Sequence, residues 1–545
     1  MIRSLTAVGD AALGSRWVWL GVLVFRLWNS VFVRTAFNPD EFWQSTEVAH
    51  GMVFGYGYLT WEWQDDAQIR GYAHPILFAA FYKALAVVGL DSRWAIAYGP
   101  RLLQGCFAAL NDYYLHKLAL TYFDRTAARW ALLCSLFSWF NFYVMVRPYS
   151  NSFETMCTTA ALANWPWAFL GSRKKDDDSR PISVSTRRWK ALSWAALGVL
   201  FRPTNAVLWI FLGIVHLKQS SDRINLVLFI VAPIAAATLC LMLLIDRRGY
   251  GEWTLVPWNF IKFNVLEGKD RLYGEHPWSW YFAQGFPSIV GTIMPLFFAG
   301  LLTAPHIKVQ CLPTASLSLH ELTVLLVEFR FVLPLLPPAL VYAGYCLRNL
   351  EKGLYVQVRQ HTQHSVLRIA LFVIAIPNLF AAVYLSRWHQ RGPLDVMDFL
   401  AETISEAPQT SIHFWTPCHA TPYYSFLHQN VSMWFPDCSP ENRLRPEGSE
   451  SQQLDREPTV FLTNKYAFSR GQSAVSEREA LPDIIVLFSS MQPRVKRLLA
   501  EGDYAQVASF FHTHVSGDAD DAEASAAMLV YRRGSADKSG GEMGM

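Results

Sequence analysis

The sequence predicts an α-helical polytopic membrane protein, with roughly ten or more spans, that ends in a small α/β domain. Hydrophobic residues make up 52% of its 545 residues and charged residues only 17%, whereas soluble domains contain roughly 25% charged residues. Long apolar runs recur as far as residue 386, and a polar region follows. One soluble core does not bury so much apolar surface, so we expect residues 1–386 to lie in a bilayer.

The charge balance and the polar residues exclude some function classes. The formal net charge is only +3, so the sequence gives no reason to expect a nucleic acid partner. His419 and His428 lie in the polar C-terminal region, but no further ligand follows at a metal-binding spacing. We therefore expect no metal ion and no cofactor, and the oligomeric state stays open.

The apolar runs and the basic residues between them predict which side of the membrane each segment faces. Arg3 and Arg16 precede a first run without a cleavage site, which predicts a retained span that starts in the cytosol. The short basic segment 171–189 is also expected in the cytosol. Strict alternation contradicts this, so at least one run between 75 and 170 is miscounted or one is re-entrant, and 190–217 is long enough for two short spans. The runs are 17–36, 75–90, 95–120, 128–146, 153–170, 190–217, 224–245, 281–303, 321–347 and 366–386.

The polar segments are expected on the lumenal side, as loops 37–74 and 246–280 and as a C-terminal region. Residues 387–532 predict a lumenal domain of mixed α/β structure. Within it, Asp483–Phe488 has the composition of a buried strand. The glycine-rich end, 533–545, predicts a disordered tail.

Two cysteines and one asparagine in the C-terminal region fit a lumenal location. Cys418 and Cys438 form a disulfide if the region faces an oxidising lumen, and free thiols are the alternative. Asn430 opens an Asn-Val-Ser sequon for N-glycosylation, a pattern that is also common by chance.

The first polar loop opens with a helix start. Asn38 predicts the cap, Pro39 the first helical position, and Glu41 the closing residue of a capping box. The residues that follow predict an amphipathic helix at the membrane surface, with Glu41 and Glu47 away from its apolar face. That face consists of Phe42, Trp43, Thr46, Ala49, Met52 and Val53.

Asp40 and Glu41 have two explanations. Acidic residues stabilise a helix N-terminus through capping and the helix dipole. In the functional explanation, one carboxylate faces a lumenal cavity and acts as a general base, because a sugar hydroxyl needs a positioned base to take its proton. Further along, Trp61, Glu62 and Arg70 predict a sugar-binding lining, or else an aromatic belt at the membrane interface.

The same loop carries a specific motif. The strings Pro-Asp-Glu-Phe-Trp-Gln-Ser-Thr-Glu-Val-Ala-His at 39–50 and Tyr-Gly-Tyr-Leu-Thr-Trp-Glu-Trp at 56–63 resemble the first lumenal loop of the GPI mannosyltransferase 3 family, of PIG-B type. That family belongs to glycosyltransferase family 22 and has the GT-C membrane fold. Related N-glycan mannosyltransferases share the Pro-Asp-Glu opening.

Further segments resemble the same family. Within the segment 259–287, residues 273–281 and 285–287 resemble the family's long mid-chain lumenal loop. In this segment, Lys262 and His276 are candidates for neutralising a leaving phosphate and Trp278 for stacking on sugar or prenyl. Anchoring at an interface is the alternative. Arg202, in an Arg-Pro-Thr string, is expected to face a cavity.

One segment departs from the family pattern. Family members carry His-Lys-Glu-Phe-Arg-Phe before an apolar, proline-rich run, whereas this chain has Leu326 and Val327 in place of the His-Lys pair. Glu328 and Arg330 match the pattern and are expected to bind substrate. The segment 416–438 again resembles the GPI branch of the family.

The resemblance implies an endoplasmic reticulum enzyme that uses dolichyl phosphate mannose and a GPI precursor bearing two mannoses, both membrane lipids. It implies addition of the third mannose through an α-1,2 link, with inversion of the donor's β configuration. Asp40 is the expected base, with Glu41 orienting or sharing that role, and Arg202, His276 and Arg330 are the cations expected at the leaving phosphate.

Two other function classes stay open from the sequence. The first is an N-glycan lipid-linked oligosaccharide mannosyltransferase with the same donor and a different acceptor. The second is a membrane transporter or scaffold, although transporters usually have related halves and this sequence has none that we detect.

Overall fold

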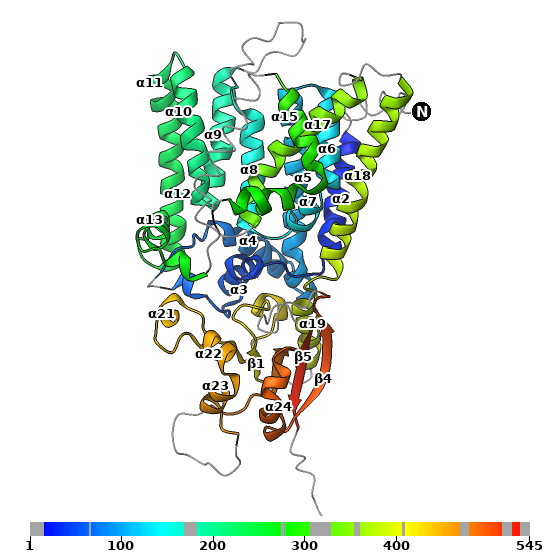
Figure 1. Ribbon diagram of the computed structural model, residues 1–545. Coiled ribbons are helices and arrows are strands. Elements are labelled where there is room, and N and C mark those ends of the chain that lie inside the picture. Colours follow the sequence, from blue (N-terminus) through cyan, green and yellow to red (C-terminus); the bar gives the residue numbers. More distant parts are fainter. Residues whose placement is uncertain are drawn as a thin grey trace, which may run out of the picture.

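A bundle of long helices and a smaller α/β domain at one of its ends make up the structure (Figure 1). The computed structural model describes residues 16–64, 67–167, 183–273, 277, 279–305, 329–353, 360–405, 409–468, 479–514 and 526–534. We call the end of the bundle that contacts the domain, where Arg93 and Tyr98 donate to Asp398, the domain end, and the opposite end the far end. The bundle contains α2 (Arg16–Phe32), α5 (Arg93–Tyr122), α6 (Arg125–Phe137), α7 (Trp139–Val144), α8 (Ser150–Asn164), α9 (Val184–Phe201), α10 (Ala206–Gln219), α11 (Arg223–Leu226), η5 (Val227–Val231), α12 (Ala232–Tyr250), η8 (Tyr281–Gly285), α14 (Phe286–Val290), η9 (Gly291–Ile293), α15 (Met294–Thr303), η10 (Phe329–Leu335), α17 (Leu336–Lys352) and α18 (Gln360–Arg387).

Helix length and composition in the bundle fit a membrane. Among the described residues, the stretches long and apolar enough to cross one are Arg223–Tyr250, Tyr281–Thr303, Phe331–Lys352 and Ser365–Ser405. The outer helices α12 and α18 leave Leu244, Phe372 and Phe380 exposed on their sides. Apolar side chains exposed along such helices are expected to face lipid.

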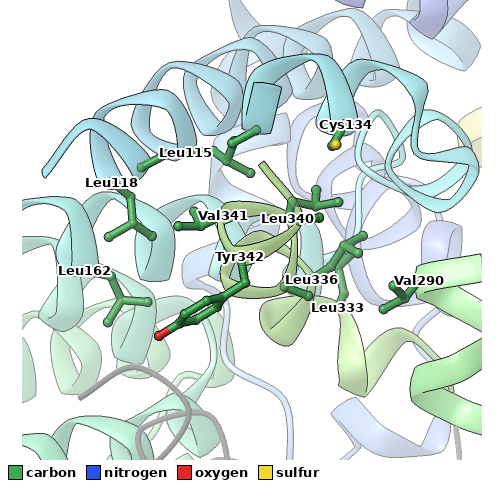
Figure 2. Packing of buried hydrophobic residues seen from close by; sticks show 14 of the residues in the cluster. Leu115, Leu118, Cys134, Leu162, Val290, Leu333, Leu336, Leu340, Val341 and Tyr342 are labelled. Carbon is green, nitrogen blue, oxygen red and sulfur yellow. The ribbon is translucent and has the colours of Figure 1, made fainter. Parts of the chain in front are cut away.

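Helix α17 forms the centre of the bundle (Figure 2). Its Leu336, Leu340 and Val341 are fully buried among side chains of α5, α6 and α8. Gly344 lets α17 approach α6 closely, because a Cβ at this position would lie 2.5 Å from the Ala131 nitrogen. This packing fixes the helices around which the loops of the domain end are arranged.

The run 75–90 does not cross the bundle, which corrects its prediction as a span. It forms α4 (Ala73–Val87), and both ends of α4 lie at the domain end. The Tyr72 N–H donates to Asp246 of α12 (2.9 Å), and after α4 the Arg93 guanidinium donates to Asp398 of the α/β domain. The apolar side chains Phe78 and Tyr82 are buried against α3 (Glu47–Phe54) and α5 rather than lipid. With α4 excluded, α2 and α9 both start at the far end, which agrees with the expected alternation.

The run 190–217 forms two helices. Ser183 caps α9 by accepting from the Thr186 N–H (3.1 Å), and α9 ends at Phe201. Pro203 opens the short turn η4 (Pro203–Asn205), after which α10 runs back. Proline removes a backbone donor and does not continue a helix, so the break occurs at Arg202 and places this arginine at the domain end.

The helix of the first loop lies between the bundle and the α/β domain, and not on an open membrane surface (Figure 1). It continues from Asp40 through η1 (Phe42–Thr46) into α3. Glu41 and Glu47, predicted away from the apolar face, are fully buried, because bundle arginines and domain N–H groups bind them. Asn38 caps the helix by accepting from the Asp40 N–H (3.0 Å), while Glu41 binds arginines instead of closing a capping box.

The α/β domain contains a five-stranded mixed sheet in the order β2-β1-β3-β5-β4. Strand β3 pairs parallel with β1 and antiparallel with β5, and all its residues are buried, as its apolar composition predicts. β5 ends at Arg533, and residues 535–545 of the predicted tail lie outside the described residues. The elements are α19 (Gly392–Ser405), β1 (Ile412–Trp415), α20 (Tyr424–Leu427), β2 (Met433–Trp434), α21 (Pro440–Arg443), α22 (Glu450–Arg456), α23 (Pro458–Lys465), β3 (Ile484–Phe488), α24 (Gln492–Glu501), β4 (Tyr504–Phe511) and β5 (Ala527–Arg533).

Candidate active site

Asp40 lies at the start of the loop helix, between the bundle and the α/β domain. Its side chain is partly exposed, whereas the neighbouring Glu41 is fully buried. The charge of Asp40 acts on two groups: it helps to raise the pKa of Glu62 and opposes the lowering of the pKa of His419. Asp40 therefore stands between the rest of the first loop and the C-terminal domain, and it is the acid of the pair that a substrate can reach.

Glu41 is held by two arginines of the bundle. Its Oε1 accepts from Arg101 Nε (2.7 Å) and its Oε2 from Arg147 Nη1 (2.6 Å). The same guanidinium groups donate to the backbone carbonyl of Thr35, at 3.0 and 2.6 Å. Both carboxylate oxygens are thus engaged inside the protein, so the geometry favours an orienting role for Glu41. It fixes the backbone on either side of Asn38 and hence the place of Asp40.

Glu62 and Arg70 are brought together as expected for a binding lining. Arg70 Nε donates to Glu62 Oε1 (2.9 Å), and Gln44 Nε2 donates to Glu62 Oε2 (3.2 Å). Burial raises the pKa of the Glu62 carboxyl, Arg70 opposes this shift, and Asp40 adds to it. A carboxylate, an amide and a guanidinium in one cluster present the hydrogen-bonding groups that a sugar needs.

A partly open cavity adjoins this cluster. The starts of α4 and α8 lie on its wall, and α10 starts there through η4, so helix N-termini with partial positive charge converge on it. Neither α4 nor α8 has a side-chain cap. The wall consists of Gln44, Trp63, Ile69, Arg70, Gly71, His74, Ser150, Phe201, Arg202, Pro203, Thr204, Val256 and Phe260.

Arg202 faces this cavity, as the sequence predicted. Its Nε lies 3.1 Å from Glu154 Oε2, and its Nη1 donates to Asn151 Oδ1 (3.2 Å). Its guanidinium also lies over the Phe331 ring, 4.9 Å from the centroid. Arg202 and Arg70, which are 132 positions apart in the sequence (202 − 70), therefore line one cavity, each oriented by an acidic side chain.

The α/β domain holds the loop helix from the other side. Glu47 accepts from the Tyr423 N–H (2.7 Å) and from the Ser425 hydroxyl (2.7 Å). Burial raises the pKa of Glu47 to about 7, although these hydrogen bonds oppose the shift. One turn earlier, Trp43 Nε1 donates to the Thr421 carbonyl (3.2 Å). The domain is thus part of the structure that positions Asp40.

Cys418 and Cys438 form the predicted disulfide. Together with His419 they lie within metal-binding distances of one another, but the disulfide occupies both sulfur atoms. The His419 ring packs at a tilt against Trp43, with ring centroids 4.8 Å apart, and burial lowers its pKa to about 4. Asn430 is exposed, so the sequon is accessible, and its glycosylation stays a prediction.

Several predicted binding residues do not join the cavity wall. Trp61 stacks on Phe263, with ring centroids 5.3 Å apart, and Lys262 is exposed beside Glu267. In the 3₁₀ turn η2 (Trp61–Trp63), successive side chains point in different directions, so Trp63 rather than Trp61 reaches the cavity. The predicted residues outside the described part of the chain are His276, Trp278 and Glu328, with the side chain of Arg330.

Sequence reasoning gave no role to some residues that build the site. Arg101 lies within the apolar run 95–120, and Arg147 directly follows the run 128–146. An arginine in such a place implies a buried partner, and this pattern could have indicated a structural role for both. Nothing in the local sequence names Glu41 as that partner. Gln44, Trp63 and His74 line the cavity through the fold of the loop, which composition does not reveal.

Comparison with known proteins identifies the family of this chain. The sequence profile of the Alg9-like mannosyltransferase family matches residues 17–428. GPI alpha-1,2-mannosyltransferase 3 of Homo sapiens is 36% identical over 517 residues, covering 94% of this chain and 87% of the human protein. Mannosyltransferase APTG1 of Arabidopsis thaliana is 38% identical over 517 residues, covering 93% of this chain and 90% of the plant protein.

Solved glycosyltransferase structures share the fold. ArnT from Cupriavidus metallidurans bound to undecaprenyl phosphate aligns with a TM-score of 0.56 at 11% identity, covering 95% of this chain and 98% of ArnT. The oligosaccharyltransferase of Archaeoglobus fulgidus aligns with a TM-score of 0.52 at 11% identity, covering 91% of this chain and 73% of that one. These likenesses support the predicted GT-C architecture.

Proposed function

Because this chain belongs to the Alg9-like mannosyltransferase family, we propose that it adds the third mannose of the GPI anchor precursor. The donor is dolichyl phosphate mannose, the acceptor is a precursor with two mannoses, and the new link is α-1,2. The observation that carries the proposal is a partly exposed Asp40 whose charge acts on Glu62, in the group formed by Gln44, Glu62 and Arg70, next to a cavity lined by two arginines. Relatives named GPI alpha-1,2-mannosyltransferase 3 support the choice of acceptor.

The reaction is one displacement with inversion. Asp40 takes the proton of the acceptor 2-hydroxyl while that oxygen attacks the anomeric carbon of mannose from the face opposite the phosphate. The bond between the anomeric carbon and the phosphate oxygen breaks, and dolichyl phosphate leaves with the electron pair. Glu41 is not the base in this scheme, because its carboxylate is paired with Arg101 and Arg147 and serves to position the loop.

The leaving phosphate needs positive charge rather than a general acid, and the cavity supplies it. Arg70 and Arg202 line the cavity, and the starts of α4 and α8 add partial positive charge. This chain's own groups are enough to orient such a donor, so the proposal includes no metal ion and no cofactor. Lipid phosphates are also what ArnT binds in its solved structure, undecaprenyl phosphate in that case.

We place the enzyme in the endoplasmic reticulum membrane, with the domain end in the lumen. The far end carries Arg188, Arg348 and Lys352, as expected of a cytosolic side. The disulfide and the exposed Asn430 suit an oxidising lumen. The number of spans stays about ten, since α4 leaves the set and the run 190–217 contributes α9 and α10.

The test is lipid analysis of cells that lack their own GPI mannosyltransferase 3. Such cells are expected to accumulate the two-mannose GPI precursor, and this chain is expected to clear it. Asp40→Asn keeps a residue that suits a helix start but removes the base, so it is expected to reach the membrane without clearing the precursor.

Asp455→Asn is the matched control, because Asp455 is an exposed acid of the α/β domain. It is expected to clear the precursor as well as the unchanged chain does. Near-normal clearance by Asp40→Asn at equal expression would show that Asp40 is only a helix-capping residue. Rescue of an N-glycan precursor instead of the GPI precursor would refute the choice of acceptor.

A further inference from the structure

Two buried side chains on the cavity wall have polar atoms without partners. Trp63 and His74 are each 3% exposed. Within the described part of the chain, the indole nitrogen of Trp63 and both ring nitrogens of His74 have no hydrogen-bond partner. The Gln44 backbone lies near enough to His74 to oppose the lowering of its pKa, but neither ring nitrogen meets the geometry of a hydrogen bond in the structure. Both side chains line the same cavity, next to Arg70 and Arg202.

Unpartnered buried polar atoms are unfavourable for folding. Leaving such an atom unsatisfied destabilises the folded state, and most buried polar groups in proteins are paired. A phenylalanine at either position would avoid this cost while filling similar space. The polar atoms are therefore expected to serve a molecule that is bound in the cavity.

The atoms define the chemistry of that molecule. The Trp63 indole is a donor only, whereas a neutral histidine has one N–H donor and one nitrogen that accepts. Burial, with the charge of Arg202 adding to it, lowers the pKa of His74 to about 3, so its imidazole is neutral near pH 7. A phosphate diester only accepts hydrogen bonds and leaves the accepting nitrogen of His74 unpaired. A hydroxyl group both donates and accepts, so adjacent ring hydroxyls satisfy all three nitrogens.

We propose that Trp63 and His74 form the subsite that recognises the ring hydroxyls of the hexose being transferred. This inference rests on the proposed function, since it needs a sugar attached to a phosphate. Arg70 and Arg202 on the same wall suit that phosphate, which is why the sugar is assigned to the donor rather than to the acceptor. Trp63 and His74 are then residues that determine donor sugar specificity.

The test is a cycle between protein variants and altered donors. The purified full chain, Trp63→Phe and His74→Asn are compared for kcat/KM with prenyl phosphate mannose donors that each lack one ring hydroxyl. The unchanged chain is expected to lose about 10-fold or more with at least one deoxy donor, because its buried groups are then left unpaired. In the matching variant that loss is expected to shrink to about 2-fold or less, since the partner is already gone.

Trp130→Phe is the matched control. Trp130 is also buried, but its indole N–H donates to Glu351 (2.6 Å) at the far end of the bundle. This variant is expected to keep the full discrimination among deoxy donors even if it is less stable.

Three results would overturn the subsite. These are equal losses with deoxy donors in the unchanged chain and both variants, no discrimination by the unchanged chain, or coupling that appears only with deoxy acceptors. Measuring kcat/KM of the unchanged chain with each deoxy donor requires no variant, so the proposal can still be refuted if either variant folds poorly. Failure of the proposed function is distinct, because the unchanged chain would then transfer no mannose from the unmodified donor.

Discussion

Glu47 is expected to make the attachment of the loop helix to the α/β domain depend on pH. Burial raises its pKa to about 7 in the folded protein, against an ordinary value of 4.5. The folded state therefore binds a proton more tightly than the unfolded state. The stabilisation that proton binding by Glu47 gives to the folded state is fully present below about pH 4.5 and is lost as the pH rises through 7.

The size of this effect follows from the two pKa values. The carboxyl is fully buried, so solvent does not screen it, and the free energy of unfolding is expected to fall by about 2–3 kcal/mol between pH 5 and pH 8. Glu47→Gln does not titrate, and its amide still accepts from the Tyr423 and Ser425 N–H groups. The fall of about 2–3 kcal/mol between pH 5 and pH 8 should therefore appear in full in the difference in unfolding free energy between the unchanged chain and this variant.

Urea titrations in detergent micelles at several pH values measure that difference. Tryptophan fluorescence is a suitable signal, because Trp43 donates to Thr421 in the same interface. Glu47→Ala is a useful comparison: it removes the acceptor altogether and is expected to be less stable than Glu47→Gln at every pH. The reasoning is refuted if the unchanged chain and Glu47→Gln lose stability in parallel from pH 5 to pH 8.

Two further changes probe the supports of the site. Glu41→Gln leaves Arg101 and Arg147 buried without a counter-charge, so we expect the unfolding free energy to fall by about 3–5 kcal/mol and mannosyl transfer to be lost. Urea titration and the transfer assay measure the two effects. Unchanged stability would contradict the reasoning. Replacing Cys418 and Cys438 by serine opens a loop with a sequence separation of 20 and is expected to cost about 3 kcal/mol. Reductant should then destabilise the unchanged chain but not the double variant, and a chain insensitive to reductant would show that the disulfide adds no stability.

Local patterns in the sequence predicted those features that depend on neighbours along the chain. The apolar run at 484–488 is a buried strand, Asn38 caps its helix, and Pro203 divides the run 190–217. The prediction of the run 75–90 as a membrane span was wrong, because an apolar composition does not show whether lipid or protein covers a helix. In α4 the apolar side chains are covered by protein.

For the candidate site, the sequence indicates which side chains have suitable chemistry but not which of them meet in the fold. Arg70, Glu62 and Arg202 were chosen by chemical type, and the fold brings Arg70 and Arg202 to one cavity. The partners of Glu41 were not predictable, because they lie 60 and 106 positions further along the chain, in α5 and in the segment between α7 and α8. Such pairings depend on the tertiary packing of the bundle, and the local sequence does not encode them.

The hydrogen bonds of Glu47 have a consequence for biosynthesis. The groups that bind it, the Tyr423 and Ser425 N–H groups, lie 376 and 378 positions further along the chain. While the ribosome is still making the last quarter of the protein, the membrane helices can already be inserted, yet this carboxylate stays without its ligands. In a nascent or prematurely ended chain, the loop helix is therefore held by Glu41 at the bundle but lacks its second attachment, to the final domain.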